Sequence, residues 1–229
     1  MKQFYDFKVE KIKNLSPEDK SLRKENLNLF YKNGFPNKKD EDWKFTDLNS
    51  ILSKNFSNIV NQDFSLDSKK LNLINEFDHN HIYLSNGKLI SSNFTYEDKN
   101  KISIIDFNYK DNKYLAKNNT LNLLNNALAI GGFTLEVTKN YKFNKPLIVY
   151  NYYSKNLKET IINNKNSIIL NDNSDLTLIN YIDSESPDNF MINTMESIEI
   201  KKDASLKNIF INNSKCAGYF YKHIKSDLE

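Results

Sequence analysis

The chain has 229 residues, 39% of them hydrophobic and 27% charged, with a net charge of +3, so it can form one large domain or two small ones. Its single cysteine excludes an internal disulfide and fits a reducing compartment. Charges interrupt the first fifteen residues, and no segment approaches the roughly 20 apolar residues of a membrane span. We therefore expect a cytoplasmic protein.

The basic residues do not favour nucleic-acid binding. Arg23 is the only arginine among 32 basic residues, and the lysines alternate with acids along the chain instead of clustering. Base recognition usually uses arginines that make bidentate contacts. We expect neither a nucleic acid nor a membrane as a partner.

The N-terminal part reads as helices. Ser16 can cap a helix whose first turn holds Pro17 and two acids, and Gly34 can end it. Thr46 or Asp47 can cap a second, shorter helix. Helices are expected over 17–33, 48–52 and 69–77.

The hydrophobic period then changes. Residues 82–90 predict two strands around an Asn86-Gly87 turn, and 102–107 predict another strand. Helical spacing returns from Tyr114 to Leu128 and stops at Gly131-Gly132.

After Gly132 short apolar runs alternate with turn residues. The expected strands are 133–137, 147–150, 161–162, 168–170, 176–182, 190–192, 198–200, 206–211 and 219–224. The expected turns are Asn140, Asn144-Lys145-Pro146, Asn163-Asn164, Asn171–Ser174, Asp188-Asn189 and Asp203.

A sandwich, a barrel or a solenoid fits this spacing. Runs that are apolar on both faces, such as Ile168-Ile169-Leu170, and connections that resemble corners favour a solenoid. Asparagines tolerate left-handed backbone at corners and can stack between coils. We expect a mainly β protein, a right-handed parallel β-helix over 131–229, preceded by a mostly helical α/β region over 1–130.

Four segments resemble a known family. They are 34–48, 82–89, 124–148 and the pair 175–179 with 203–206. In this order they are similar to the SufD scaffold subunits of the SUF iron–sulfur cluster assembly system and, more distantly, to the paralogous SufB subunits. The residues that carry the resemblance, interpreted as structural, are Gly34, Pro36, Glu41, Trp43, Lys44, Thr46, Asn125, Ala127, Gly132 and Pro146.

The chain departs from the family pattern at several positions. Phe45 replaces a tyrosine and Asn37 a threonine, and Ser174 and Asp203 stand at corners where Ala or Gly is usual. The family's β-helix and a helical region implied to bind the SufC ATPase continue beyond Glu229. The resemblance therefore implies an N-terminal portion only, whose last coil is expected to aggregate or dimerise when alone.

The resemblance implies a non-catalytic scaffold that docks with a SufB-like subunit and a SufC-like ATPase. No cofactor is expected on this chain alone, because the assembled complex handles the iron–sulfur cluster. No phosphate-binding loop and no nucleophile–histidine motif occur, so we expect no enzyme. The alternatives are a generic β-helix interaction module and a β-helix carbohydrate-active enzyme.

Individual residues leave several alternatives open. Trp43 suits either a structural anchor or a docking contact, and Glu41 and Lys44 can pair beside it. His79 and His81, with Asp78, suit either a metal or a solvated turn, and we favour the turn and assign no metal ligand. Cys216, beside Lys215 and seven residues before His223, is expected to be an ordinary thiol rather than a sulfur carrier.

Overall fold

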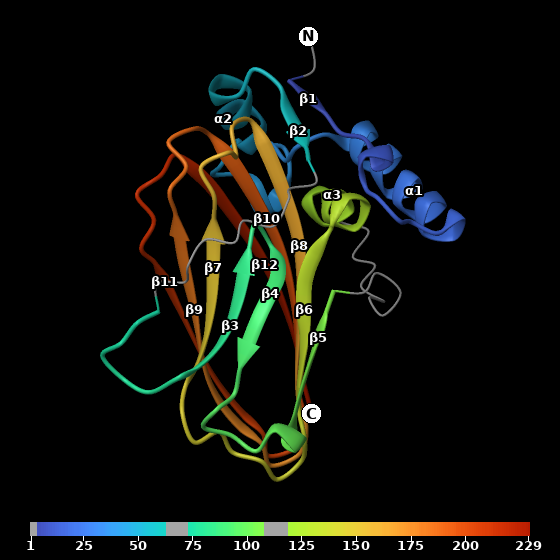
Figure 1. Cartoon of the computed structure of the whole chain (residues 1–229). Helices are drawn as coiled ribbons and strands as arrows, with labels where there is room; N and C mark the ends of the chain where they lie inside the picture. Colours follow the sequence, from blue (N-terminus) through green and yellow to red (C-terminus); the bar gives the residue numbers. More distant parts are fainter. Residues whose placement is uncertain (1–3, 63–72, 108–118) are drawn as a thin grey trace.

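The computed structural model describes residues 4–62, 73–107 and 119–229. The α-helices gather at one end of two long sheets (Figure 1). The α-helices are α1 Pro17–Asn33, α2 Leu48–Asn55 and α3 Thr120–Leu128, and the 3-10 turns are η1 Val9–Lys11, η2 Glu41–Trp43 and η3 Lys99–Lys101. The strands are β1 Tyr5–Asp6, β2 Ile59–Asn61, β3 Asn80–Ser85, β4 Lys88–Asn93, β5 Ile102–Asp106, β6 Gly131–Val137, β7 Leu147–Tyr153, β8 Thr160–Leu170, β9 Asp175–Ser184, β10 Phe190–Ile200, β11 Ser205–Asn212 and β12 Gly218–Leu228.

The first two helices begin and end as their local sequence predicts. The Ser16 side chain accepts a hydrogen bond from the Asp19 amide, and Gly34 ends α1 with a φ of 73°. Asp47, rather than Thr46, caps α2 by accepting from the Ser50 amide.

The hairpin around Asn86-Gly87 is also confirmed. β3 and β4 are antiparallel, and Asn86 and Gly87 have φ angles of 48° and 81°, as a tight turn between twisted strands requires. The expected helix over 69–77 is wrong where the structure describes it, because residues 73–79 form no regular element. Residues 69–72 and 114–118 of the expected helices lie outside the described residues.

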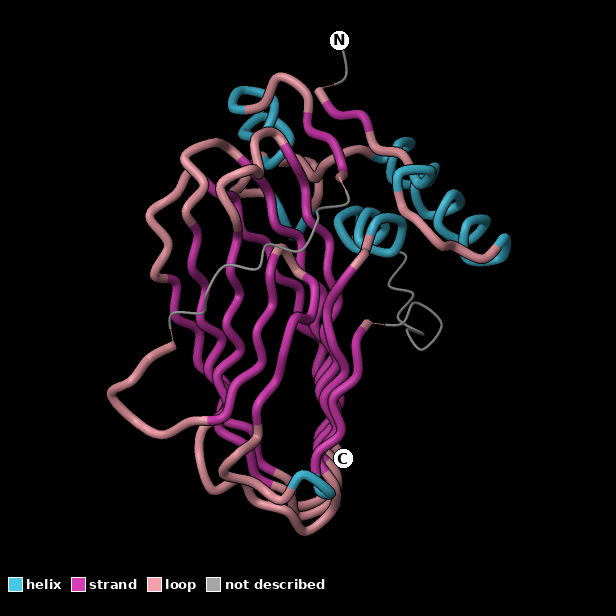
Figure 2. The backbone as a smooth tube through the Cα atoms, viewed as in Figure 1, coloured by secondary structure: helices cyan, strands magenta, loops and turns pink. Residues whose placement is uncertain are grey.

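The predicted parallel solenoid is confirmed. One sheet, sheet A, contains β8, β10 and β12 in parallel register, and the facing sheet B contains β7, β9 and β11 in parallel register. Each coil consists of one strand of sheet B followed by one strand of sheet A. The successive coils are β7 with β8, β9 with β10 and β11 with β12 (Figures 1 and 2). The apolar side chains between the sheets form one continuous core, which includes Leu135, Val149 and Leu178.

One expected turn is wrong, because Asn163-Asn164 lies inside β8. The expected strands 190–192 and 198–200 are parts of the single strand β10. The asparagine side chains bond to the next coil, because Asn193 donates to the Asn163 side chain and Thr194 donates to the Asn164 side chain, both within 2.9 Å. A side-chain ladder therefore satisfies the Oδ1 atoms of two asparagines that the sequence pattern assigns to a turn.

The corners use left-handed residues, as expected. Asn140, Asn173 and Asp203 have φ angles of 59°, 54° and 55° in successive coils. The Asn173 amide donates to the Asn140 side chain at 3.1 Å, so the first two corners stack. Asn173, and not Ser174, takes the left-handed conformation.

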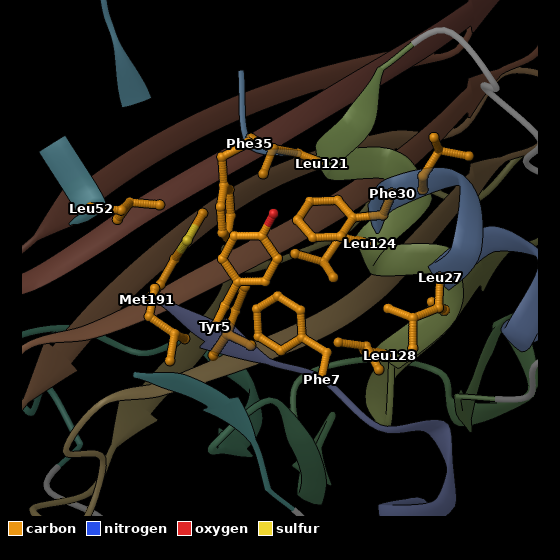
Figure 3. Close-up of a cluster of buried hydrophobic side chains, with 14 of the residues drawn as sticks. Tyr5, Phe7, Leu27, Phe30, Phe35, Leu52, Leu121, Leu124, Leu128 and Met191 are labelled. Atoms are coloured by element: carbon orange, nitrogen blue, oxygen red, sulfur yellow. The ribbon is translucent and has the colours of Figure 1, made fainter. Parts of the chain in front are cut away.

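Strands ahead of the first full coil complete both sheets. β2 pairs with the first two residues of β8, β6 pairs with residues 164–170 of the same strand, and β3 pairs with β7. A second core lies between these elements and the helices, where rings of Tyr5, Phe30 and Phe35 pack among leucines of α3 and Met191 of β10 (Figure 3). None of the described helices has the length and apolar character needed to cross a bilayer.

Candidate functional site

The last coil of the solenoid presents an open edge. β11 pairs with β9 and β12 pairs with β10, and no described strand pairs with the other side of either. Apolar side chains of this coil are exposed, from 40% for Ile224 to 74% for Leu228, together with Phe210 and Ile211. Unpaired strand edges with apolar side chains are surfaces on which another chain can add strands.

An ion pair closes the interior at this edge. Lys222 Nζ lies 2.9 Å from a Glu196 carboxylate oxygen and 4.1 Å from the ring centroid of Phe210 on the facing sheet. The Glu196 side chain is completely buried. Burial lowers the pKa of Lys222, although Glu196 acts in the opposite direction. The lysine therefore joins the two sheets and neutralises a carboxylate that has no access to water.

Aromatic residues of the N-terminal part pack against the last described strand, β12. Trp43 in η2 lies 5.8 Å from the Tyr221 ring, and Phe56 lies 5.4 Å from the Tyr219 ring, both measured between centroids. The Asn119 amide donates to the Tyr221 hydroxyl at 3.0 Å. Burial raises the pKa of Tyr221. The outer face of the first half of β12 is thus covered by N-terminal elements.

A groove lies beside Trp43. It has a volume of about 240 Å³ and is lined by Pro36, Asp40, Glu41, Asp42, Trp43, Asn119 and Thr120. The expected Glu41–Lys44 pair is wrong, because no ion pair joins these two described residues and the Lys44 ammonium lies 5.0 Å from the Phe45 ring centroid. Phe45, which replaces the usual tyrosine, is 88% exposed.

The other signature residues of the first segment hold its turn. The Gly34 amide donates to the Phe30 carbonyl at 2.6 Å, and the Pro36 carbonyl accepts from the Asn49 amide at 2.9 Å. The Thr46 amide donates to the Trp43 carbonyl at 2.8 Å, while its side chain is exposed. These contacts fix the path from α1 to α2.

The signature residues of the third segment lie where α3 meets the solenoid. Asn125 is fully buried, and its amide donates to the Asn164 and Asn193 carbonyls at 3.1 and 2.7 Å. The buried Ala127 offers its carbonyl to Arg23 at 3.0 Å. Gly132 has a φ of 127°, and a Cβ there would overlap the Lys165 backbone. The Pro146 carbonyl accepts from the Asn80 amide at 2.9 Å.

The histidine segment is not the solvated turn that the sequence suggested. His79 and His81 are half-buried, and His81 belongs to β3. The Asp78 carboxylate accepts from the Tyr96 hydroxyl at 3.1 Å and lies 3.4 Å from Lys145 Nζ. Within the described ranges no three residues of the His, Cys, Asp and Glu types are grouped for a metal.

The remaining candidate residues lie on the last coil. Cys216 is half-buried in the loop between β11 and β12, next to a cluster that contains Tyr153 and Phe190. His223 lies on β12, in register with Met195 of β10. The contacts among Glu196, Phe210 and Lys222 could not be predicted from the sequence, because they depend on the register of β10, β11 and β12.

Comparison with known proteins places this geometry in a family. The family model described as the SufBD protein N-terminal region matches residues 2–149, which is more than half of the chain. A search of curated proteins finds no match. With a parallel solenoid and the signature residues at its joints, the chain belongs to the SufB/SufD family of iron–sulfur cluster assembly.

Proposed function

We propose that this chain is a non-catalytic, cytoplasmic scaffold of the SufD type. In this proposal it docks with a SufB-like subunit and with a SufC-like ATPase. The iron–sulfur cluster is handled by the assembled complex, and the chain alone carries no resident iron–sulfur cluster.

The observation that carries this proposal is the family match over residues 2–149, together with the parallel solenoid that follows it. A partner that adds strands to such a solenoid gains main-chain hydrogen bonds and covers apolar surface at the same time. The sequence has no phosphate-binding loop, so the proposal assigns ATP hydrolysis to the partner.

Co-expression with a SufB-like and a SufC-like subunit tests the proposal. Affinity capture of this chain is expected to recover the SufB-like subunit in stoichiometric amount. Ile224→Lys on β12 and Ile105→Lys on β5 place a charge on residues of similar exposure, 40% and 48%. A recovery that falls at least tenfold in one variant alone, about 1.4 kcal/mol of binding free energy, identifies the strand that the subunit contacts.

The outcomes separate the function from the docking surface. Failure of the wild-type chain to recover a SufB-like subunit contradicts the scaffold function. Recovery equal to that of the wild type in both variants keeps the function and places the docking surface away from β5 and β12.

A further inference from the structure

Two histidines and a tyrosine meet on the outer face of sheet B. β3 and β7 lie side by side there (Figure 1), with His81 on β3, His79 just before it, and Tyr150 on β7. The ring centroids lie 5.9 Å apart for His79 and Tyr150, 6.4 Å for His79 and His81, and 6.4 Å for His81 and Tyr150. Each of the three rings therefore neighbours the other two.

Hydrogen bonds define how His79 is oriented. Its Nδ1 lies 3.0 Å from the Phe77 carbonyl oxygen and its Nε2 lies 2.9 Å from the Tyr150 hydroxyl. A carbonyl oxygen only accepts, so Nδ1 carries the proton and donates to it. Nε2 then presents its lone pair and accepts from Tyr150, whose oxygen accepts in turn from the Ile74 amide at 3.1 Å.

This orientation is the one that metal-binding histidines have. In such a histidine one ring nitrogen donates its proton to a carbonyl or carboxylate, which fixes the tautomer. The other ring nitrogen then faces the metal. His81 adds a second imidazole, whose ring centroid lies 6.4 Å from those of His79 and Tyr150. A third donor could not be found from the sequence, because Tyr150 is 71 residues from His79.

We propose that His79, His81 and Tyr150 bind one divalent first-row transition-metal ion. The protein ligands are Nε2 of His79, one ring nitrogen of His81 and Oη of Tyr150. Imidazole nitrogen with an oxygen donor suits Zn²⁺ and Cu²⁺ among such ions. Asp78 is outside the set, because its carboxylate is bonded to Tyr96 and Lys145.

Binding exchanges a proton for the metal. The Tyr150 O–H bond breaks, its oxygen bonds to the ion, and the proton passes to solvent, so the charge of the site rises by one with each divalent ion bound. The proton that leaves is the one that the Tyr150 hydroxyl donates to His79 Nε2 in the structure. The ligand positions that remain are filled by water or by a partner protein.

Equilibrium dialysis of the tag-free full chain against Zn²⁺ and Cu²⁺ tests the site. The wild type is expected to bind one ion per chain. His79→Gln, His81→Gln and Tyr150→Phe are each expected to weaken binding at least about tenfold. The Cu²⁺ form should show a visible phenolate-to-metal charge-transfer band that Tyr150→Phe abolishes while the His223→Gln variant retains it.

His223→Gln and Tyr152→Phe are the matched controls, since they remove the third histidine and the next outward tyrosine of β7. Both are expected to bind like the wild type. Circular dichroism checks folding, and His79→Gln changes a partly exposed residue outside the strands, so it keeps the test decisive if Tyr150→Phe misfolds. Wild-type binding no tighter than that of His79→Gln, or binding lost only in His223→Gln, overturns the proposal.

Discussion

The two ends of the solenoid are built differently. At the first coil, β4 runs antiparallel to β3 and β5 runs antiparallel to β6, so each sheet ends in a strand that breaks the parallel repeat. At the last coil, β11 and β12 keep the parallel register of the coils before them. Short antiparallel strands with polar exposed residues discourage further pairing, whereas a regular apolar edge permits it. A further strand, of this chain or of another, can therefore add to β11 and β12 more readily than to β4 and β5. The end with β4 and β5 is the capped end, and the end with β11 and β12 is the open end.

The largest expected difference in stability between the two ends comes from the close approach of the backbone at Gly132. At the capped end, Gly132→Ala places a Cβ into the Lys165 backbone at a φ of 127°, and nothing flexible can move away. At the open end, Gly218→Ala meets only the rings of Phe190 and Phe220, which can rotate. We expect Gly132→Ala to lower the free energy of unfolding by more than about 4 kcal/mol and Gly218→Ala by about 1 kcal/mol. Urea unfolding measures both, and equal losses would contradict the close approach at Gly132.

Glu97 is expected to have the next largest effect. Its carboxylate holds the corner of the capped end by accepting from the Asn80 side chain, the Tyr141 hydroxyl and the Asn144 and Lys145 amides, at 2.7 to 3.2 Å. Glu97→Ala leaves the Tyr141 hydroxyl and the Asn144 and Lys145 backbone amides without this acceptor, and it is expected to cost about 3 kcal/mol of unfolding free energy in thermal or urea denaturation.

Glu136→Ala is the control for Glu97, because it removes one exposed hydrogen bond from Asn171. It is expected to change stability by less than about 0.5 kcal/mol. Similar losses of unfolding free energy in Glu97→Ala and Glu136→Ala would mean that Glu97 does not organise the corner.

Local features of this fold could be predicted from the sequence, whereas distant pairs could not. Ser16, Gly34 and Asn86-Gly87 act through the nearest few residues, so their roles follow from the local sequence alone. Asn163 looked like a turn residue because its partner, Asn193, is 30 positions away in the next coil. Strand length was therefore underestimated wherever a side-chain ladder replaced an apolar contact.

The same reason limited the prediction of the site. The sequence singled out Trp43 as a large ring among charges, but its contact Tyr221 is on the last strand. Glu196 and Lys222 become partners only through the register of β10 and β12. His79 and His81 were recognised as neighbours, but their third ring comes from β7.

A buried lysine makes stability at the capped end depend on pH. Lys165 donates to the Asn126 side chain at 2.6 Å, and burial, with a contribution from Arg23, lowers its pKa to about 7. In the unfolded chain the lysine keeps its proton to about the ordinary value of 10.5. The unfolded state therefore binds more protons between these values, and stability rises with pH by up to about 1.4 kcal/mol per unit.

Urea unfolding of wild type and Lys165→Met at pH 7, 8 and 9 measures this effect. The free energy of unfolding of the wild type is expected to rise relative to that of Lys165→Met across the series. The same comparison with Lys222→Met at the open end should give a smaller slope, because Glu196 raises the pKa of Lys222 against the effect of burial. A difference between wild type and Lys165→Met that does not change with pH would exclude a lowered pKa at Lys165.

The ring contact between Trp43 and Tyr221 of β12 has the smallest expected effect on stability, and hydrogen exchange measures that effect locally. Trp43→Ala removes the ring contact with Tyr221, and Phe45→Ala removes a ring that is 88% exposed two residues away. We expect Trp43→Ala to cost about 1 kcal/mol and Phe45→Ala less than about 0.5 kcal/mol. Amide hydrogen exchange should accelerate over residues 218–223 in Trp43→Ala and remain unchanged in β4. Because the two variants differ only in which ring is lost, equal acceleration in both would show that the aromatic stack does not hold β12, and the N-terminal signature would then act on the solenoid only through α3.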